Sequence, residues 1–172
     1  SMASPGTDIA FSEARTEGYR AFANKIWNAA RFIFMQMERA KEAGIVIDLA
    51  HLSEALQPSK DSPLEACWIV SRLNGCAADV NQALENYRFD DAANLIYQFF
   101  WGEFCDWYLE IVKIRLDFSE NANRPGTSRA RSTRLGGFDA ALRLLSPFMP
   151  FLTEEIWYAL FAGKPPAKSI AL

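Results

Sequence analysis

Four residues near the beginning of the chain combine side chains that suit nucleic-acid binding. Lys25, Asn28, Arg31 and Phe32 lie within eight positions of one another. An aromatic ring offers a face to an unstacked base, cations meet phosphates, and an amide can hydrogen-bond to a base edge. The combination is typical of RNA recognition. The alternative is that Phe32 makes a second packing contact with another helix, and the residues alone favour packing.

The segment that carries these four residues has the periodicity of an amphipathic helix over residues 12–43, and Gly44 is expected to end it. One stripe of the segment is apolar at the spacing of a core-facing surface and consists of Tyr19, Phe22, Ile26, Ala29, Ala30 and Ile33. The four candidate residues lie away from this stripe. A helix buried along the stripe would present them outward, with Phe32 projecting among polar side chains.

A second helix is predicted where residues 62–65 (SPLE) resemble a capping box with proline at the first helical position. This helix is expected to end near Tyr87. Its inward residues are expected to be Trp68, Val70, Leu73, Ala77, Val80 and Leu84. No segment of the chain alternates between apolar and polar residues as a half-buried strand would.

Three more helices complete the predicted bundle. Their expected ranges are residues 90–116 with Asp90 as the cap, residues 128–145, and residues 150–162 with Pro150 at the start. Gly136 and Gly137 are a weak point that costs about 1 kcal/mol per glycine. The polar, turn-rich residues 120–127 predict a mobile loop. We therefore expect an all-α fold, a helical bundle of about five helices.

Aromatic side chains crowd the stretch FFWGEFCDWYLEIVK, residues 99–113. A helix that is apolar around most of its circumference is buried between its neighbours, so the stretch predicts core packing and not a ligand site. Trp107 falls on the expected buried face, and its replacement by alanine should destabilise the bundle by about 3–5 kcal/mol. Glu103 also falls there and needs a hydrogen-bond or ion-pair partner.

A second group of cations, Arg124, Arg129, Arg131 and Arg134, follows in and after the predicted loop. A solvated helix face is the usual explanation of such a run, and contact with phosphates is the alternative. Neither interpretation assigns a catalytic role to these arginines.

Composition excludes several classes of function. The 172 residues carry a net charge of −3, so no basic field covers the whole molecule, although a local patch can still bind nucleic acid. The three cysteines form no CxxC pair and His51 is the single histidine, which argues against a zinc site or a Cys–His nucleophile. The odd cysteine count is typical of a reducing, cytoplasmic location. No apolar run reaches the roughly 18 residues that span a bilayer.

Four stretches, in order along the chain, closely resemble the C-terminal part of bacterial-type valyl-tRNA synthetases. They are ASPGTDIAFSE (3–13), NKIWNAARF (24–32), FFWGEFCDWYLE (99–110) and SPFMPFLTEEIW (146–157). Within them, residues 4–8 and 28–32 favour the valine family over the isoleucine family.

This resemblance implies that residues 1–11 connect from a catalytic domain and that residues 12–172 form the helical anticodon-binding domain of a class I synthetase. It implies that Lys25, Arg31 and Phe32 contact the anticodon of valine tRNA. Asn28 joins them because it shares their helix face. With the resemblance, binding becomes the favoured role of Phe32.

The HIGH and KMSKS motifs, which hold ATP in this family, are absent from the sequence. The resemblance therefore implies a chain with no catalytic residues that binds no cofactor, whereas a parent valine–tRNA ligase uses ATP and magnesium. Valine tRNA isoacceptors and the catalytic domain of the parent chain are the expected partners. We expect a cytoplasmic monomer with no membrane contact.

Two alternatives remain open from the sequence. The first is the corresponding domain of an isoleucyl- or leucyl-tRNA synthetase, which binding preference among purified tRNAs would separate. The second is a helical protein–protein interaction module, whose binding would be indifferent to RNA.

Overall fold

The computed structural model describes residues 13–45, 47–57, 60, 62–118 and 127–172, and regular structure in these residues is entirely helical. The elements are α1 (Glu13–Glu42), η1 (Glu54–Leu56), α2 (Leu64–Glu85), α3 (Phe89–Gln98), η2 (Phe99–Leu109), α4 (Glu110–Phe118), α5 (Thr127–Leu145) and α6 (Pro150–Leu160). The predicted all-α bundle of about five helices is confirmed, because α3, η2 and α4 form one continuous helix.

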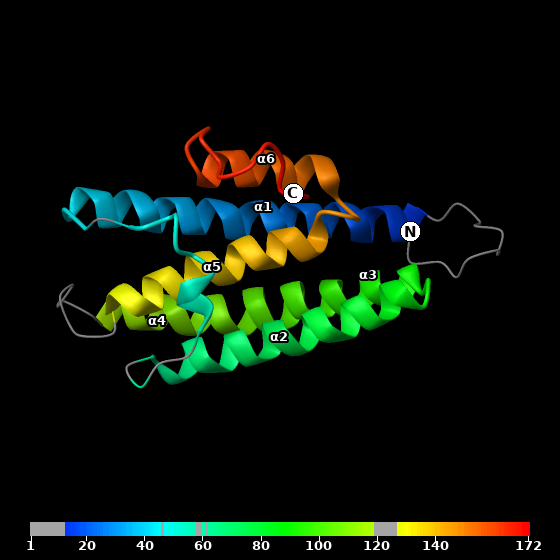
Figure 1. Ribbon diagram of the computed structural model, residues 1–172, viewed down its shortest axis with the longest axis horizontal. Coiled ribbons are helices and arrows are strands. Elements are labelled where there is room, and N and C mark those ends of the chain that lie inside the picture. Colours follow the sequence, from blue (N-terminus) through cyan, green and yellow to red (C-terminus); the bar gives the residue numbers. More distant parts are fainter. Residues whose placement is uncertain (1–12, 46, 58–59, 61, 119–126) are drawn as a thin grey trace.

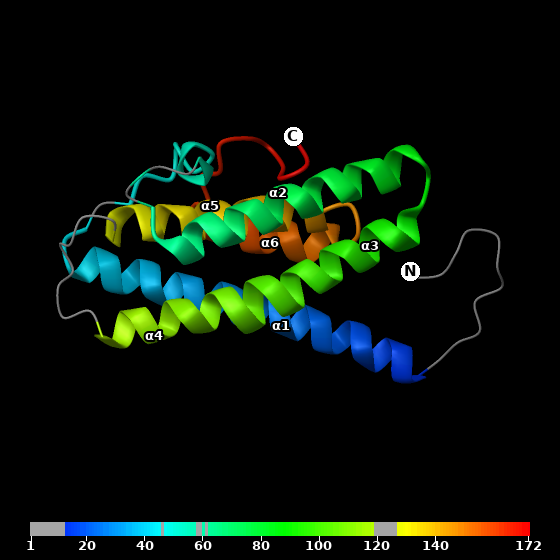
Figure 2. The same cartoon turned by 90° about the horizontal axis from the view of Figure 1, so that it is seen from below.

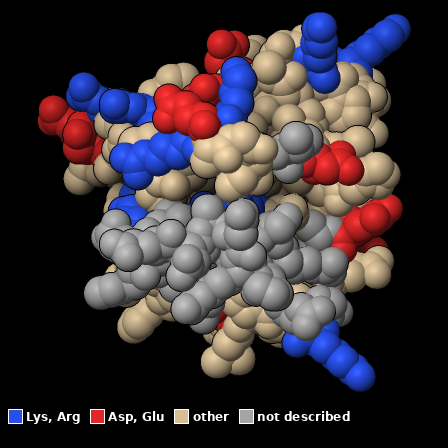
Figure 3. All heavy atoms as spheres, turned by 90° about the vertical axis from the view of Figure 1, so that its left-hand side faces the viewer, with Lys and Arg blue, Asp and Glu red and all other residues tan. Residues whose placement is uncertain are grey.

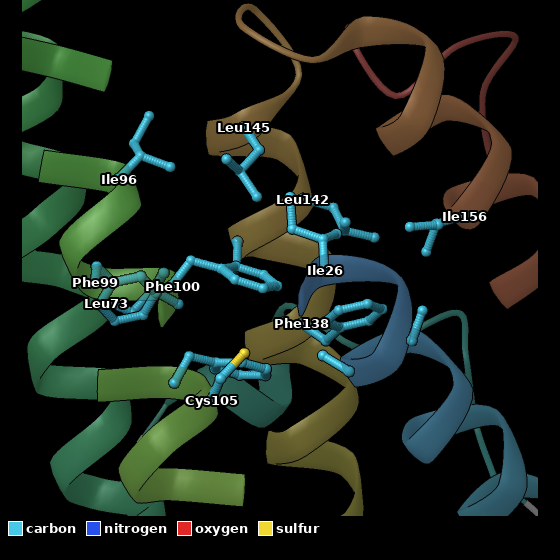
Figure 4. Packing of buried hydrophobic residues seen from close by; sticks show 14 of the residues in the cluster. Ile26, Leu73, Ile96, Phe99, Phe100, Cys105, Phe138, Leu142, Leu145 and Ile156 are labelled. Carbon is cyan, nitrogen blue, oxygen red and sulfur yellow. The ribbon is translucent and has the colours of Figure 1, made fainter. Parts of the chain in front are cut away.

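The helices pack in layers around α5 (Figure 1). α5 packs against α2, α3 and α6, whereas α1 packs directly against α6 and against η2 of the continuous helix made by α3, η2 and α4. The core fills the space between them. Figure 4 shows Ile26 of α1, Leu142 of α5 and Ile156 of α6 pointing toward one another, and all three are fully buried.

The predicted end of α1 is confirmed in detail. Gly44 has a φ of +71°, a conformation that favours glycine. Its N–H donates to the carbonyl of Lys41, and the N–H of Ile45 donates to the carbonyl of Ala40, each over 2.9 Å. This pair of hydrogen bonds is a Schellman motif, which satisfies carbonyls that the helix leaves without partners.

Two predicted helix starts were wrong by a residue or two. Pro63 is the N-cap of α2 and not its first helical residue, and no side-chain cap hydrogen bond forms there. The third helix begins at Phe89 with Arg88 as N-cap, so Asp90 lies in its first turn. A carboxylate in the first turn still favours the helix, because it faces the positive end of the helix dipole. The predicted loop at residues 120–127 and the connecting segment at residues 1–11 lie outside the described residues, except for Thr127, which begins α5.

The prediction that Trp107 is buried was wrong, since 65% of its surface is exposed. The cause is η2, which is π-helical. Hydrogen bonds from i to i+5 put more residues into each turn than the α-helical pattern does, so each residue rotates less around the axis. The buried residues of η2 accordingly come in adjacent pairs, which are Phe99 and Phe100, Phe104 and Cys105, and Tyr108 and Leu109. Trp107 falls outside this face.

Two other residues predicted to face inward are also exposed. Tyr19 is 44% exposed because the first turns of α1 diverge from the neighbouring helices, as Figure 2 shows. Trp68 is 36% exposed because the buried face of α2 is centred on Ile69, Leu73 and Val80 instead.

The predicted partner for Glu103 is present. Arg72 of α2 donates to both carboxylate oxygens of Glu103, from Nε over 2.7 Å and from Nη2 over 2.5 Å. A bidentate pair of this kind fixes the relative orientation of two side chains as well as joining them. It ties α2 to η2 across the edge of the bundle.

The glycine pair of α5 differs in its surroundings. A Cβ built on Gly136 would lie 2.5 Å from the backbone oxygen of Leu52, just before η1, whereas a Cβ on Gly137 would meet the Phe104 ring at 3.7 Å. The first distance is a clash with backbone and the second is an ordinary contact. Gly136 therefore allows the η1 segment to approach α5. The low helix propensity of glycine does not by itself explain this role.

We predict that Gly136→Ala destabilises the bundle by about 1–3 kcal/mol, the usual cost of overpacking. Gly137→Ala is the matched control and should be neutral or stabilising by up to about 1 kcal/mol, because alanine is the better helix former. Urea unfolding of both variants measures the difference. Equal stabilities would show that the approach of η1 to α5 does not depend on Gly136.

Candidate nucleic-acid interface

The four residues singled out in the sequence lie on α1 within two helical turns, a span of roughly 10 Å along the axis. Asn28 and Arg31 are exposed. Lys25 and Phe32 are half-buried, and each contacts a side chain from the continuous helix beside α1. The structure therefore brings the four residues to one surface but gives them different surroundings.

Lys25 is held by an ion pair. Its Nζ donates to Oδ1 of Asp106 over 2.5 Å and lies 5.2 Å from the centroid of the Trp101 ring. The hydrogen bond to Asp106 raises the pKa of Lys25, which therefore stays charged. A phosphate at this position has to compete with a carboxylate that is already bound.

Phe32 packs against the core, and its ring also faces a cation. It belongs to the partly buried residues around the main hydrophobic cluster. The Nζ of Lys113 lies 5.3 Å from the ring centroid and is itself bound to Glu110 over 2.6 Å. The prediction that Phe32 projects away from the core was therefore only partly correct. A base that stacks on the face of the ring covered by Lys113 has to displace that side chain.

Sequence reasoning missed the two residues that contact this surface from the neighbouring helix, Asp106 and Lys113. Asp106 is 81 positions from Lys25, and no local pattern connects them. It also missed Trp27, an exposed aromatic on α1. The sequence does indicate that Trp27 is exposed, because it precedes Arg31 by four residues and lies off the apolar stripe. Trp27 adds an exposed ring beside Arg31, on the side of α1 that faces away from Phe32.

For Arg131 and Arg134, the two arginines of the second group whose side chains the structure describes, the predicted solvated helix face was wrong. Arg131 is half-buried and Arg134 is buried. Arg124 and the side chain of Arg129 lie outside the described residues.

Other kinds of site find little support in the part of the chain that the structure describes. No three His, Cys, Asp or Glu residues are grouped there so as to hold a metal ion. Burial raises the pKa of Cys105 to about 12 and that of Cys76 to about 11, so both thiols are protonated and unreactive near neutral pH. None of the described helices has the length and apolar character needed to cross a membrane.

An all-α bundle whose first helix presents cations, an amide and aromatic rings is suited to binding RNA. Residues 66–172 match the family model described as the anticodon-binding domain of tRNA ligase. The chain belongs to this family.

Individual relatives are similar over almost the whole chain. A valine–tRNA ligase of Solibacter usitatus is 45% identical over 99% of this chain, and one of Geobacter sulfurreducens is 44% identical over 98%. A valine–tRNA ligase of Dechloromonas aromatica is 42% identical over all of it. The matched region spans only 17–18% of the length of these relatives.

Proposed function

We propose that this chain binds the anticodon stem-loop of valine tRNA, as the anticodon-binding domain of a valine–tRNA ligase. The observation that carries the proposal is the identity of 42–45% with valine–tRNA ligases over 98–100% of this chain. No comparable observation favours the isoleucine or leucine enzymes, or a protein–protein interaction module.

In this proposal α1 supplies the contacts. Unstacked anticodon bases lie against the ring of Phe32, and Asn28 hydrogen-bonds to a base edge. Lys25 and Arg31 bind phosphates, which positions the loop without adding sequence information. Valine anticodons share their second and third bases, so those two positions are the ones that a single site can read.

Asp106 gives this surface a means of discrimination. A phosphate that binds Lys25 must displace the Asp106 carboxylate or share the ammonium with it, and Asp106 repels any phosphate placed nearby. Specificity is a difference between affinities, and a repulsive group near the site lowers binding of RNA that makes no compensating base contacts. Asp106 therefore favours RNA that also satisfies Asn28 and Phe32.

The proposal places this chain within a larger enzyme. The parent ligase would use ATP and magnesium in a catalytic domain, whose HIGH and KMSKS motifs are not in this sequence. Residues 1–11 would connect to that domain. The parent would act in the cytoplasm as a monomer.

The test compares two RNA hairpins, one with the valine anticodon stem-loop and one with its second anticodon base changed. We expect the change to weaken binding about 5- to 150-fold, since a lost base-edge contact is worth roughly 1–3 kcal/mol. Filter binding or fluorescence anisotropy at one fixed salt concentration measures both affinities. Equal affinities would contradict anticodon reading, and no binding of either hairpin would favour a protein-binding module.

A further inference from the structure

A pocket of about 190 Å³ lies between the C-terminal half of α1, the segment that follows α1 and the beginning of α5. Part of its wall is aliphatic and includes Ile33, Ile45 and Leu135. The polar part of its wall consists of Gln36, Arg39, Arg131 and Arg134. The pocket is smaller than the roughly 300 Å³ at which sites for drug-sized ligands begin, so its size suits a single small group.

Arg134 is the most informative residue of this pocket. Only 6% of its surface is exposed, and the guanidinium hydrogen-bonds to the Tyr108 side chain. Among the described residues, its Nε has no hydrogen-bond acceptor. Buried donors are almost always paired, so the Nε of Arg134 is available to an acceptor in the pocket, either water or a bound anion. Burial also lowers the pKa of Arg134, so a negative group in the pocket would stabilise its charged form.

Arg131 adds a second cation that has no structural explanation. It lies one helical turn before Arg134 on α5, is half-buried, and makes no ion pair with a described residue. Arg39 is different, because a cation in the last turn of α1 offsets the negative end of the helix dipole. The described residues lining the pocket include no Asp or Glu. The pocket wall therefore presents several guanidinium donors and no carboxylate, and the carboxylate that acts on Arg134 is that of buried Glu65 on α2, behind the wall.

The pocket also continues the candidate interface. Gln36 and Arg39 follow Phe32 by one and two turns on the same face of α1, a distance of roughly 10 Å from Phe32 to Arg39. Figure 3 looks onto this end of the molecule, where basic and acidic side chains of the described residues are mixed. The surface is not uniformly basic here, so selection of an anion has to come from the pocket itself.

We infer that this pocket binds a backbone phosphate of the RNA whose bases contact Phe32. The inference rests on the proposed function and extends the interface along α1 to α5. The guanidinium groups of Arg131 and Arg134 donate to the phosphate oxygens, and the Nε of Arg134 gains its acceptor. A buried arginine that only fills space would explain neither the unpaired Nε nor Arg131.

The test replaces Arg131 and leaves Arg134 intact, because Arg134 is buried and its loss would endanger the fold. Arg131→Ala is compared with Arg20→Ala, which also removes one positive charge from an exposed position near the opposite end of α1. Affinity for the valine anticodon hairpin is measured across a range of salt concentrations. Arg131→Ala should weaken binding about tenfold and reduce the slope of log affinity against log salt by about 0.7, the value for one lost phosphate contact. Arg20→Ala should change neither.

Each other outcome has a distinct meaning. If the unsubstituted protein binds the hairpin and Arg131→Ala binds it with the same affinity and salt slope, the pocket is not an RNA phosphate site, and the proposed function stands. Equal losses in both variants would show a general charge effect and overturn the inference. If the parent does not bind the hairpin, the proposed function fails and this inference fails with it.

Two further measurements complete the test. Thermal unfolding of Arg131→Gln, which keeps most of the side-chain volume, checks that weaker binding does not arise from unfolding. Inorganic phosphate is compared with chloride at equal ionic strength for its effect on the melting temperature of the unsubstituted protein. One contrary outcome is that phosphate raises the melting temperature of the unsubstituted protein but not that of Arg131→Ala, while Arg131→Ala binds RNA as well as the unsubstituted protein does. That combination would assign the pocket to free anions and overturn its assignment to RNA.

Discussion

Replacing Trp157 with alanine should destabilise this bundle by about 3–5 kcal/mol, the usual cost of truncating a buried large aromatic residue. Trp157 of α6 is fully buried, and its Nε1 donates to Oδ1 of Asp139 on α5 over 2.8 Å. The guanidinium of Arg143 lies 5.3 Å from the centroid of the same ring. The variant would leave both a cavity and an Asp139 oxygen without its donor. Urea unfolding followed by circular dichroism measures the loss.

Trp107→Ala is the matched control, because the residue type is the same and 65% of the side chain is exposed. Its effect should stay within about 0.5 kcal/mol, as for most surface substitutions. Trp157→Phe separates the two contributions, since it retains an aromatic ring but leaves Oδ1 of Asp139 unpaired, at a cost of about 1–3 kcal/mol. If Trp107→Ala destabilised the protein as much as Trp157→Ala, Trp107 would be buried and the buried face of η2 would differ from the one described here.

The contrast between these two tryptophans shows how far the sequence predicts the fold. Local patterns were sufficient for the number of helices and for the end of α1 at Gly44, because periodicity and backbone conformation act over a few residues. Trp107 was misplaced because α-helical geometry was assumed through η2. Phe100, Phe104 and Tyr108 of η2 are fully buried, and no local pattern records the tertiary packing around them.

The sequence also predicted only part of the candidate interface. The sequence identified Lys25, Asn28, Arg31 and Phe32 as one group, and the structure places them on one surface of α1. It could not identify Asp106, because the ion pair with Lys25 joins positions 81 residues apart. Nor could it distinguish Arg134, buried and hydrogen-bonded to Tyr108, from a solvated arginine of the same helix. Partners across a tertiary contact are set by the fold and not by spacing in the sequence.

Phe32→Ala should weaken binding of the valine anticodon hairpin by roughly 1–3 kcal/mol, or about 5- to 150-fold in Kd, if a base stacks on its ring. Stacking involves no ion release, so the salt dependence of binding should stay nearly unchanged. Lys25→Ala should have the opposite signature, with a loss that is similar for every RNA and a shallower salt slope. Fluorescence anisotropy titrations at several salt concentrations measure both quantities.

The half-buried position of Phe32 requires a control for folding, and α1 provides one. Phe34 is also half-buried against the core cluster, but it lies two residues further on and therefore near the opposite side of the helix. Phe34→Ala should lower the unfolding free energy about as much as Phe32→Ala does and leave RNA affinity at the parental value. Binding is measured well below the melting temperature of each variant. If Phe34→Ala weakened RNA binding as much as Phe32→Ala, the loss would come from destabilisation of α1, and Phe32 would have no stacking role.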